Sequence, residues 1–263
     1  MLRIIVPIKQ VPDMSRVRFD TEKGVIDRAS AGSEINPFDL NALEAAVQLK
    51  EKLGGVVSVI SMGPQTAETA LKDAIARGAD RAILLSDKEF AGADTLATSY
   101  TLAGAIKKLG DFDLIICGEK TVDGDTGQVG AELAEHLDLP YAAYVSKLTA
   151  THSGLTLTSE FENERYLISG AYPILISVTK DVNNPRLPTL RDKLAARKAA
   201  VEVWDARELA NTADRNRFGT AGSPTTVYKI TAPAEEGRKG KIHRKIEDEA
   251  LEEIASVLGE CLK

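Results

Sequence analysis

Cysteine, histidine and aromatic residues are all scarce in this chain of 263 residues. It contains two cysteines, Cys117 and Cys261, three histidines and 5 % Phe, Trp and Tyr. Two cysteines so far apart in sequence exclude a disulfide framework and a cysteine-rich zinc site, and they favour a reducing compartment. Three histidines leave little material for a histidine metal centre. The sequence has no Ser-His-Asp, H-E-x-x-H or C-x-x-C pattern, which argues against hydrolytic and zinc chemistry.

Long apolar runs and clustered positive charge are also missing. The chain has 43 % hydrophobic and 27 % charged residues, and Lys+Arg 33 against Asp+Glu 39 give a formal net charge of −6. Because nucleic acids and anionic membranes attract clustered Lys and Arg, this balance argues against both as partners. No stretch approaches the ~18 apolar residues of a membrane span, and the first apolar run is too short for a signal peptide. We therefore expect a cytoplasmic protein without membrane insertion.

The first half of the chain alternates short apolar runs with helix-length amphipathic stretches. The runs rich in Ile, Val and Leu predict strands over 2–7, 56–62, 82–85 and 114–117. Helices are expected from Asn36, as N-cap before Pro37, to Gly54, and then over about 65–78, 95–109 and 128–139. Four such steps predict an α/β fold with a doubly wound, mostly parallel sheet that helices cover on both faces, a three-layer αβα arrangement.

After Pro140 the pattern changes. Short strands are expected over 142–148, 155–161, 166–170 and 174–178, and a basic helix over 189–198. Residues 211–241 are rich in Gly, Pro, Thr and charge and indicate an extended arm, which an amphipathic helix over 242–262 follows. The sequence thus predicts an α/β domain over residues 1–210 and a C-terminal arm and helix over residues 211–263.

The most informative segment follows the fourth expected strand and contains Gly124, Gly127 and Gly130 at intervals of three. Glycines let a backbone approach a phosphate closely, and loops at the carboxyl ends of parallel strands face the ligand crevice. The spacing matches neither the dinucleotide fingerprint nor a Walker loop. An ordinary Asp-Gly turn followed by a helix cap explains the segment about equally well, because the carboxylates of Asp123 and Asp125 should repel a phosphate. We expect these two aspartates to fix loop amides.

Three further strand or helix ends should converge on the same crevice: residues 7–13, 36–39 and 62–64. Each of them is also explained by a turn, a cap or a strand break. Lys9 lies just beyond a strand, where a cation is well placed to meet a phosphate or a flavin. Cys117 is expected to be a buried apolar thiol and His136 an ordinary residue on a helix surface.

Five motifs, in order along the chain, resemble the β subunit of electron transfer flavoprotein: VPIKQVPD, INPFDLNALEAAVQLKE, VISMGP, AIARGADRAILL and CGEKTVDGDTGQVGAELAEHLDLP. The resemblance implies a heterodimer with a larger α subunit that holds an FAD, and an adenine nucleotide in the β-subunit crevice. It places the nucleotide contacts at Pro7, Asn36, Pro37, Phe38, Asp39, Met62, Lys120, Thr121, Val122, Asp123, Gly124, Asp125, Thr126, Gly127, Gln128, Val129, Gly130 and Ala131.

The resemblance also implies where partners bind. The segment Arg186-Leu187-Pro188-Thr189-Leu190-Arg191 resembles the family's recognition loop, whose leucine, here Leu190, anchors an acyl-CoA-type dehydrogenase. The C-terminal arm is expected to wrap the α subunit. Residues 159–173 depart from the family's glycine-containing turn, so the local fit to the α subunit is not carried over for them.

The family has two versions. In the housekeeping version the nucleotide is structural AMP, and the phosphate loop commonly carries three aspartates. Here Gly124 stands between Asp123 and Asp125, and Gly222-Ser223-Pro224-Thr225 precedes Val227; both features resemble the flavin-bifurcating version, whose β subunit holds FAD reduced by NADH. A glycine removes one negative charge and one side chain where a pyrophosphate must sit.

The resulting hypothesis is an electron-transfer subunit of an NADH-dependent bifurcating oxidoreductase complex. Electrons from NADH would pass through a β-bound FAD to the α-subunit FAD and the dehydrogenase, and to ferredoxin. Such transfer needs no general base or nucleophile, because the cofactor carries the redox chemistry. The alternatives are a housekeeping β subunit with AMP, a non-redox nucleotide-binding module on the same core, and a structural partner subunit with a vestigial site.

Overall fold

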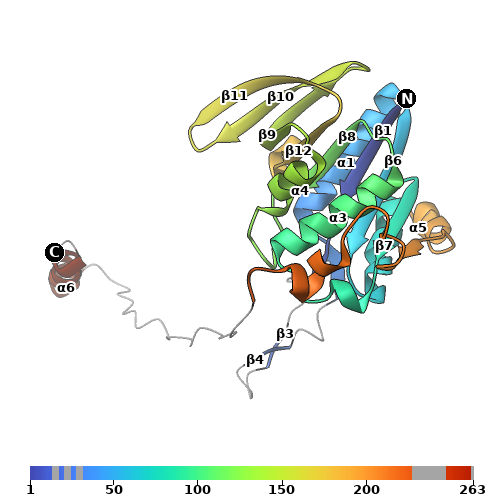
Figure 1. Cartoon of the computed structure of the whole chain (residues 1–263). Helices are drawn as coiled ribbons and strands as arrows, with labels where there is room; N and C mark the ends of the chain where they lie inside the picture. Colours follow the sequence, from blue (N-terminus) through green and yellow to red (C-terminus); the bar gives the residue numbers. More distant parts are fainter. Residues whose placement is uncertain (14–17, 21–24, 28–31, 227–246, 262–263) are drawn as a thin grey trace. The chain divides into compact units, whose positions relative to one another are not determined.

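The computed structural model describes residues 1–13, 18–20, 25–27, 32–226 and 247–261 (Figure 1). The chain divides into two compact units, Met1–Val227 and Tyr228–Lys263. The first unit has the predicted α/β fold. The described part of the second unit is one helix, α6 (Asp248–Cys261), which lies within the range expected for a C-terminal helix.

A nine-stranded sheet forms the centre of the first unit, in the order β11-β10-β9-β12-β8-β1-β6-β7-β13. All neighbours from β9 to β13 are parallel, whereas β10 pairs antiparallel with both β9 and β11. The strands are β1 (Leu2–Pro7), β6 (Gly55–Met62), β7 (Arg81–Leu85), β8 (Leu114–Gly118), β9 (Tyr141–Ala150), β10 (Gly154–Phe161), β11 (Glu164–Ala171), β12 (Ile174–Val178) and β13 (Glu202–Trp204).

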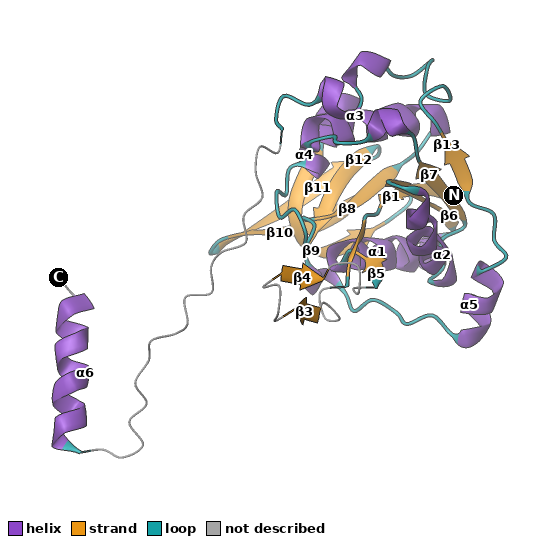
Figure 2. Ribbon diagram, turned by 90° about the horizontal axis from the view of Figure 1, so that it is seen from below, coloured by secondary structure: helices purple, strands orange, loops and turns teal. Residues whose placement is uncertain are grey.

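Helices cover both faces of the parallel strands (Figure 2). The helices α1 (Pro37–Leu53) and α2 (Glu68–Ala76) lie on one face, and α3 (Thr95–Leu109) and α4 (Val129–Leu137) on the other. Side chains alternate along β1 accordingly: Ile4 and Val6 belong to the apolar cluster under α1 and α2, and Ile5 to the cluster under α3 and α4. Burial on both faces explains why these strands are continuous apolar runs in the sequence.

The sheet is doubly wound around β1. From β1 the chain proceeds outward through β6 and β7, and it then returns to place β8 on the other side of β1. The carboxyl ends of β1 and β8 therefore lie at the switch point of the topology, where ligands bind in open α/β sheets. The mostly parallel, doubly wound sheet predicted from the sequence is confirmed.

Short elements complete the first unit. The strands β2 (Gln10–Pro12) and β5 (Ser33–Ile35) pair antiparallel, as do β3 (Arg18–Asp20) and β4 (Val25–Asp27). The one-turn helices are η1 (Gln65–Ala67), η2 (Lys88–Phe90), η3 (Lys180–Val182), η4 (Arg215–Arg217) and η5 (Gly219–Gly222), and the short helix α5 (Leu190–Ala196) begins within the segment 186–191 that was predicted to dock a partner.

The first unit extends beyond residue 210, where we expected the arm to begin. Residues 211–226 include η4 and η5, which contact α3, and Phe218 is fully buried against Phe90. Residues 227–246 of the expected arm lie outside the described residues. In the described part of the chain, no helix combines the length and apolarity needed to cross a membrane.

Candidate functional site

A cleft of about 600 Å³ opens at the carboxyl ends of β1, β6 and β8. It lies at the switch point of the sheet and brings together residues from five separate segments of the sequence. Of the residues predicted to bind a nucleotide, the cleft is lined by Pro7, Lys9, Asp39, Met62, Lys120, Thr121, Gly124, Thr126, Gly127, Gln128, Val129 and Gly130. The remaining ones, Asn36, Pro37, Phe38, Val122, Asp123, Asp125 and Ala131, do not line it.

Asn36 fixes the glycine-containing loop from behind. Its side chain is fully buried, and Nδ2 donates to the Lys120 carbonyl at 2.8 Å while Oδ1 accepts from the Val122 amide at 3.1 Å. Asn36 occupies the N-cap position of α1, as predicted, but its side chain makes no capping hydrogen bond there. The residue therefore ties the start of α1 to the loop after β8, a role that its type and position did not indicate.

Asp39, in the first turn of α1, joins the ends of β1 and β8. Its Oδ2 accepts from the Lys9 amide at 2.8 Å, and its carboxylate also faces the Gly118 amide. Burial raises the pKa of Asp39 to about 7, against hydrogen bonds from Lys9 and Asn36 that favour the ionised form. A methyl group on Gly118 would collide with Asp39 Oδ1 and the Phe38 backbone, so a glycine is required at the end of β8.

Two ion pairs balance the charge of the loop. Lys9 Nζ lies 2.7 Å from a carboxylate oxygen of Asp123, and Lys120 Nζ lies 2.7 Å from one of Asp125. Burial opposes ionisation of Asp123, but the Lys9 ammonium group holds the pKa of its carboxyl below the usual value. The two aspartates thus pair with lysine ammonium groups, and the Asp123 carboxylate also accepts from the Thr121 side chain and from its own backbone amide, a contact of the kind we had expected. Pairing also reduces the repulsion that they would exert on a phosphate.

The backbone of the loop turns sharply before α4. Asp125 and Gly127 have φ angles of 53° and 63°, in the left-handed region that favours glycine. Val129 and Gly130 then open α4 at the cleft. The first N–H groups of a helix lack intrahelical partners and carry a partial positive charge, so this end of α4 suits an anion.

The beginning of α3 is a wall of the cleft that the sequence analysis did not identify. Ala93, Asp94, Thr95, Thr98 and Leu102 line it, together with Ile8 and Cys117, Gly118 and Glu119 at the ends of β1 and β8. A signal was present, because an Asp-Thr pair opens the helix that follows β7. We had used it only as a helix boundary.

Asp94 connects this wall to a segment near the end of the first unit. One carboxylate oxygen caps α3 by accepting from the Ala97 amide at 3.1 Å. The other accepts from the Thr225 amide at 3.0 Å and from the Thr225 hydroxyl at 2.8 Å, and Ser223 Oγ accepts from the Asp94 amide at 2.9 Å. The residues 222–225 noted in the sequence therefore lie beside the cleft.

The environment of Cys117 agrees with the prediction, whereas that of His136 differs from it. Cys117 is a buried thiol, as predicted, and burial raises its pKa, so the nucleophilic thiolate is disfavoured. His136 was expected to be a residue of the helix surface, but it is half-buried, and its ring packs edge-on against Tyr100 at 5.4 Å between centroids. Burial and the nearby Arg217 guanidinium lower the pKa of His136. The contact arises because α3 and α4 are neighbours, which the helical pattern alone does not show.

The predicted docking residues, Arg186, Leu187, Pro188, Thr189, Leu190 and Arg191, lie apart from the cleft, since none of them lines it. Leu187 and Leu190 are exposed, and Thr189 and Asp192 form a capping box at the start of α5. Arg186 is held by two carboxylates of α1. No group of three or more His, Cys, Asp and Glu in the described part of the chain could hold a metal ion.

Comparisons with known proteins agree with this architecture. The model of the electron transfer flavoprotein domain family matches residues 23–209. The chain is 41 % identical to the electron transfer flavoprotein subunit beta of Megasphaera elsdenii, over 99 % of this chain and 98 % of that protein. It is 42 % identical to the corresponding subunit of Thermoanaerobacterium thermosaccharolyticum, over 98 % of each chain, and 38 % identical to protein FixA of Sinorhizobium fredii, over 97 % and 93 %. The chain therefore belongs to the electron transfer flavoprotein family and is similar to its β subunits over almost its entire length.

Proposed function

We propose that this chain is the β subunit of a heterodimeric electron transfer flavoprotein and binds FAD in the cleft at the switch point. The observation that carries the proposal is the combination of this cleft with the loop of residues 119–128, which Asn36 holds from behind, and with Asp39, which joins the ends of β1 and β8. Electron transfer through a bound flavin needs position and electrostatics from the protein and no nucleophile.

The residues of the cleft fit a dinucleotide. Pro7, Met62, Leu102 and Val129 offer apolar surface to a ring system, and the beginnings of α3 and α4 offer backbone N–H groups to phosphates. Lys9 and Lys120 line the same cleft, and each is already paired with an aspartate outside it. Exchange of an aspartate for a phosphate would keep each lysine paired when the ligand binds.

Two features favour FAD over AMP. Gly124 lines the cleft between two aspartates that do not, so the loop presents no side chain at its centre. Ser223 and Thr225 are fixed to Asp94 at the opposite wall, which extends the polar rim beyond the loop; Val227 lies outside the described residues. The second mononucleotide of FAD, which AMP lacks, would find polar groups at this wall of the cleft.

When bound, FAD would supply two-electron chemistry with NADH and one-electron chemistry with other redox centres. The residues of this chain bind and orient it: the helix ends hold its phosphates, Asn36 holds the loop, and Asp39 holds the ends of β1 and β8 together. We further propose that the α subunit holds the second FAD, that the C-terminal helix belongs to the interface with it, and that an acyl-CoA-type dehydrogenase and ferredoxin accept the electrons in the cytoplasm.

Cofactor counting tests the proposal. The chain is co-expressed with its α subunit, the heterodimer is purified, and flavin and adenine nucleotide are released and quantified. Two FAD for each heterodimer, together with bleaching of the flavin spectrum by NADH, would support the bifurcating version. One FAD with one AMP would replace it with the housekeeping version. A colourless protein that binds ATP and ignores the α subunit would indicate the non-redox module.

A further inference from the structure

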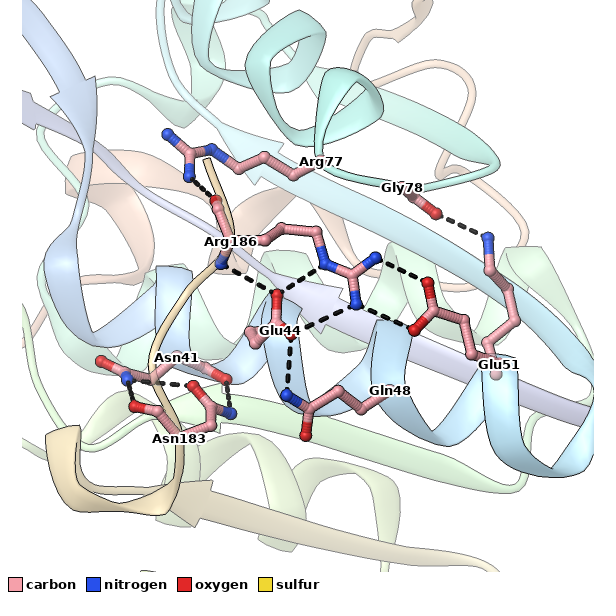
Figure 3. A network of polar contacts seen from close by, with 9 residues as sticks. Asn41, Glu44, Gln48, Glu51, Arg77, Gly78, Asn183 and Arg186 are labelled. Atoms are coloured by element: carbon pink, nitrogen blue, oxygen red, sulfur yellow. Dashed lines mark hydrogen bonds and ion pairs between the residues drawn. The ribbon is translucent and has the colours of Figure 1, made fainter. Parts of the chain in front are cut away.

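The segment that carries the exposed leucines is held against α1 by a network of polar contacts (Figure 3). Asn41, Glu44, Gln48 and Glu51 are spaced by three, four and three residues, so they lie along one face of α1. Asn41 and Asn183 exchange side-chain to backbone hydrogen bonds of 2.9 and 3.0 Å, which fix the segment where it leaves η3.

Arg186 makes the largest contribution to this network. Its Nε donates to Glu44 at 2.8 Å and its backbone amide donates to the same oxygen at 3.1 Å, while the far side of the guanidinium forms bonds of 2.6 and 2.9 Å with Glu51. The Arg186 carbonyl accepts from Arg77 at 2.6 Å. Both the side chain and the backbone of this residue are therefore fixed, one to α1 and the other to the end of α2.

Glu44 is the buried partner in this arrangement, with 5 % of its surface exposed. Burial alone would raise its pKa, but hydrogen bonds from the Arg186 guanidinium and amide and from Gln48 hold the pKa below its usual value. A buried carboxylate is stable only when it is paired and hydrogen-bonded, so Glu44 ties the position of Arg186 to the packing of α1.

The residues that follow Arg186 are presented to solvent. Leu187, Leu190 and Leu194 are 85 %, 74 % and 50 % exposed, and we call these three residues the leucine face. Four exposed cations lie in α5 or directly after it, and none of them forms an ion pair with another described residue: Arg191, Lys193, Arg197 and Lys198. An apolar face within a positive rim fits a protein surface with an apolar pocket and a carboxylate rim.

We infer that Arg186 is a positioning residue: its clamp to Glu44 holds the segment of residues 183–189 in one conformation, so that the leucine face is formed before a partner binds. This inference rests on the proposed function, because the partner is the electron-accepting dehydrogenase. Ordering a loop during association costs binding free energy, and a face that is already ordered avoids that cost. The guanidinium is fully engaged with α1, which leaves the leucines and the free cations to contact the partner.

The test uses the purified heterodimer and four variants: Glu44→Gln, Arg186→Ala, Glu51→Gln as matched control, and Leu190→Ala. Hydrogen exchange of residues 183–190 is measured without any partner. Electron transfer to a purified bacterial short-chain acyl-CoA dehydrogenase then gives KM for the heterodimer and kcat. Flavin content is measured for every variant, and Glu44→Gln keeps the test decisive if Arg186→Ala fails to fold.

The clamp predicts that Glu44→Gln and Arg186→Ala accelerate exchange of residues 183–190 at least about tenfold and raise KM by a similar factor, with kcat and flavin content unchanged. Glu51→Gln should change the exchange rate and KM by less than about threefold, because its ion pair with Arg186 is exposed and exposed pairs contribute little. Leu190→Ala should raise KM without accelerating exchange.

The experiment distinguishes failure of the clamp from failure of the docking proposal. If Glu44→Gln and Arg186→Ala leave exchange or KM at the wild-type value while Leu190→Ala raises KM, the clamp is overturned and the docking proposal stands. If Leu190→Ala also leaves KM unchanged, or the wild-type heterodimer passes no electrons to this dehydrogenase, the docking part of the proposed function fails. In that case accelerated exchange would still show that the clamp orders the segment, but the inferred purpose of that order would be rejected.

Discussion

Lys9 and Asp123 form an ion pair of 2.7 Å beside the cleft, and only the lysine lines it. The pair joins the end of β1 to the loop after β8, so it spans the switch point of the sheet. Because Lys9 is the member that faces the cleft, the proposed phosphate would compete with Asp123 for the same ammonium group. We therefore expect the two residues to have opposite effects on ligand binding.

The first prediction uses these opposite signs. Lys9→Gln should weaken binding of FAD or AMP to the stripped heterodimer about tenfold, because a charge-assisted contact is lost. Asp123→Asn should strengthen nucleotide binding several-fold, because Lys9 then has no ion pair to break before it contacts the phosphate. Titration calorimetry measures both. Weaker binding in both variants would show that the ion pair acts by shaping the loop.

The second prediction concerns Asn36. Asn36→Ala should lower the free energy of unfolding by about 2–3 kcal/mol, because the Lys120 carbonyl and the Val122 amide lose their buried partner. Nucleotide affinity should fall as well, since the loop is released. Urea unfolding gives the first value, and Asn163→Ala, in the exposed turn between β10 and β11, is the control expected to stay within about 0.5 kcal/mol. Equal effects of the two substitutions would contradict the role assigned to Asn36.

The third prediction is a pH dependence that Asp39 creates. Burial raises the pKa of Asp39 from its ordinary value of 3.8 to about 7 in the fold, so the folded chain holds this proton more tightly, and the wild type loses stability as the pH rises from about 4 to about 7. Asp39→Asn cannot ionise. The stability of this variant relative to wild type should therefore rise between about pH 4 and pH 7, by up to about 4 kcal/mol. Urea unfolding across that range checks it, and a difference that stays constant with pH would mean that Asp39 is already ionised at low pH.

The fourth prediction concerns the close approach of β8 and α1. Gly118→Ala should destabilise the fold by about 1–3 kcal/mol and weaken nucleotide binding, because the added methyl group meets Asp39 and the backbone of Phe38. Gly32→Ala is the control, since this residue is exposed and nothing lies within 4 Å of the added carbon there. Thermal unfolding of both variants measures the difference. A Gly118→Ala variant as stable as wild type would show that α1 can shift without cost.

The fifth prediction compares a leucine of the leucine face with a similarly exposed leucine elsewhere on the surface. Leu167, on β11, is 79 % exposed and Leu190 is 74 % exposed, so their replacement by alanine removes similar surfaces. Leu190→Ala should raise KM for the dehydrogenase about tenfold or more, as expected for an apolar anchor, without loss of flavin. Leu167→Ala should leave KM unchanged. Flavin loss in Leu190→Ala would mean that the segment was assigned to the wrong site.

Parallel strands were the easiest part of the fold to predict. Burial on both faces forces apolar runs such as Ile4 to Val6, which are visible in the sequence. The strand β13 was not predicted, because it has three residues and contains Glu202, which pairs with Arg81 on the neighbouring β7. Its strand identity comes from the neighbour and not from its own composition.

The candidate site was predictable where it follows strand ends. That rule identified Lys9 and the glycine loop, and the helix start at residues 36–39 identified Asp39. It did not identify Asp94, because its place beside the cleft depends on how α3 crosses the sheet. Arg186 was predicted only as part of the segment that resembles a recognition loop. Its contact with Glu44 was not predicted, because Glu44 is 142 residues away in the chain, a separation across which sequence patterns carry no signal.

Helix α1, with 17 residues, makes two separate sets of contacts. Asn36, at its N-cap, holds the cleft loop, and the side chains from Asn41 to Glu51 hold residues 183–186. Inserting a single residue between Asn36 and Glu44 would rotate the second set of contacts by about 100° and move it about 1.5 Å relative to the first. The number of residues between Asn36 and Glu44 is therefore constrained, because an insertion or deletion there would move the contacts that hold the cleft loop out of register with those that hold residues 183–186.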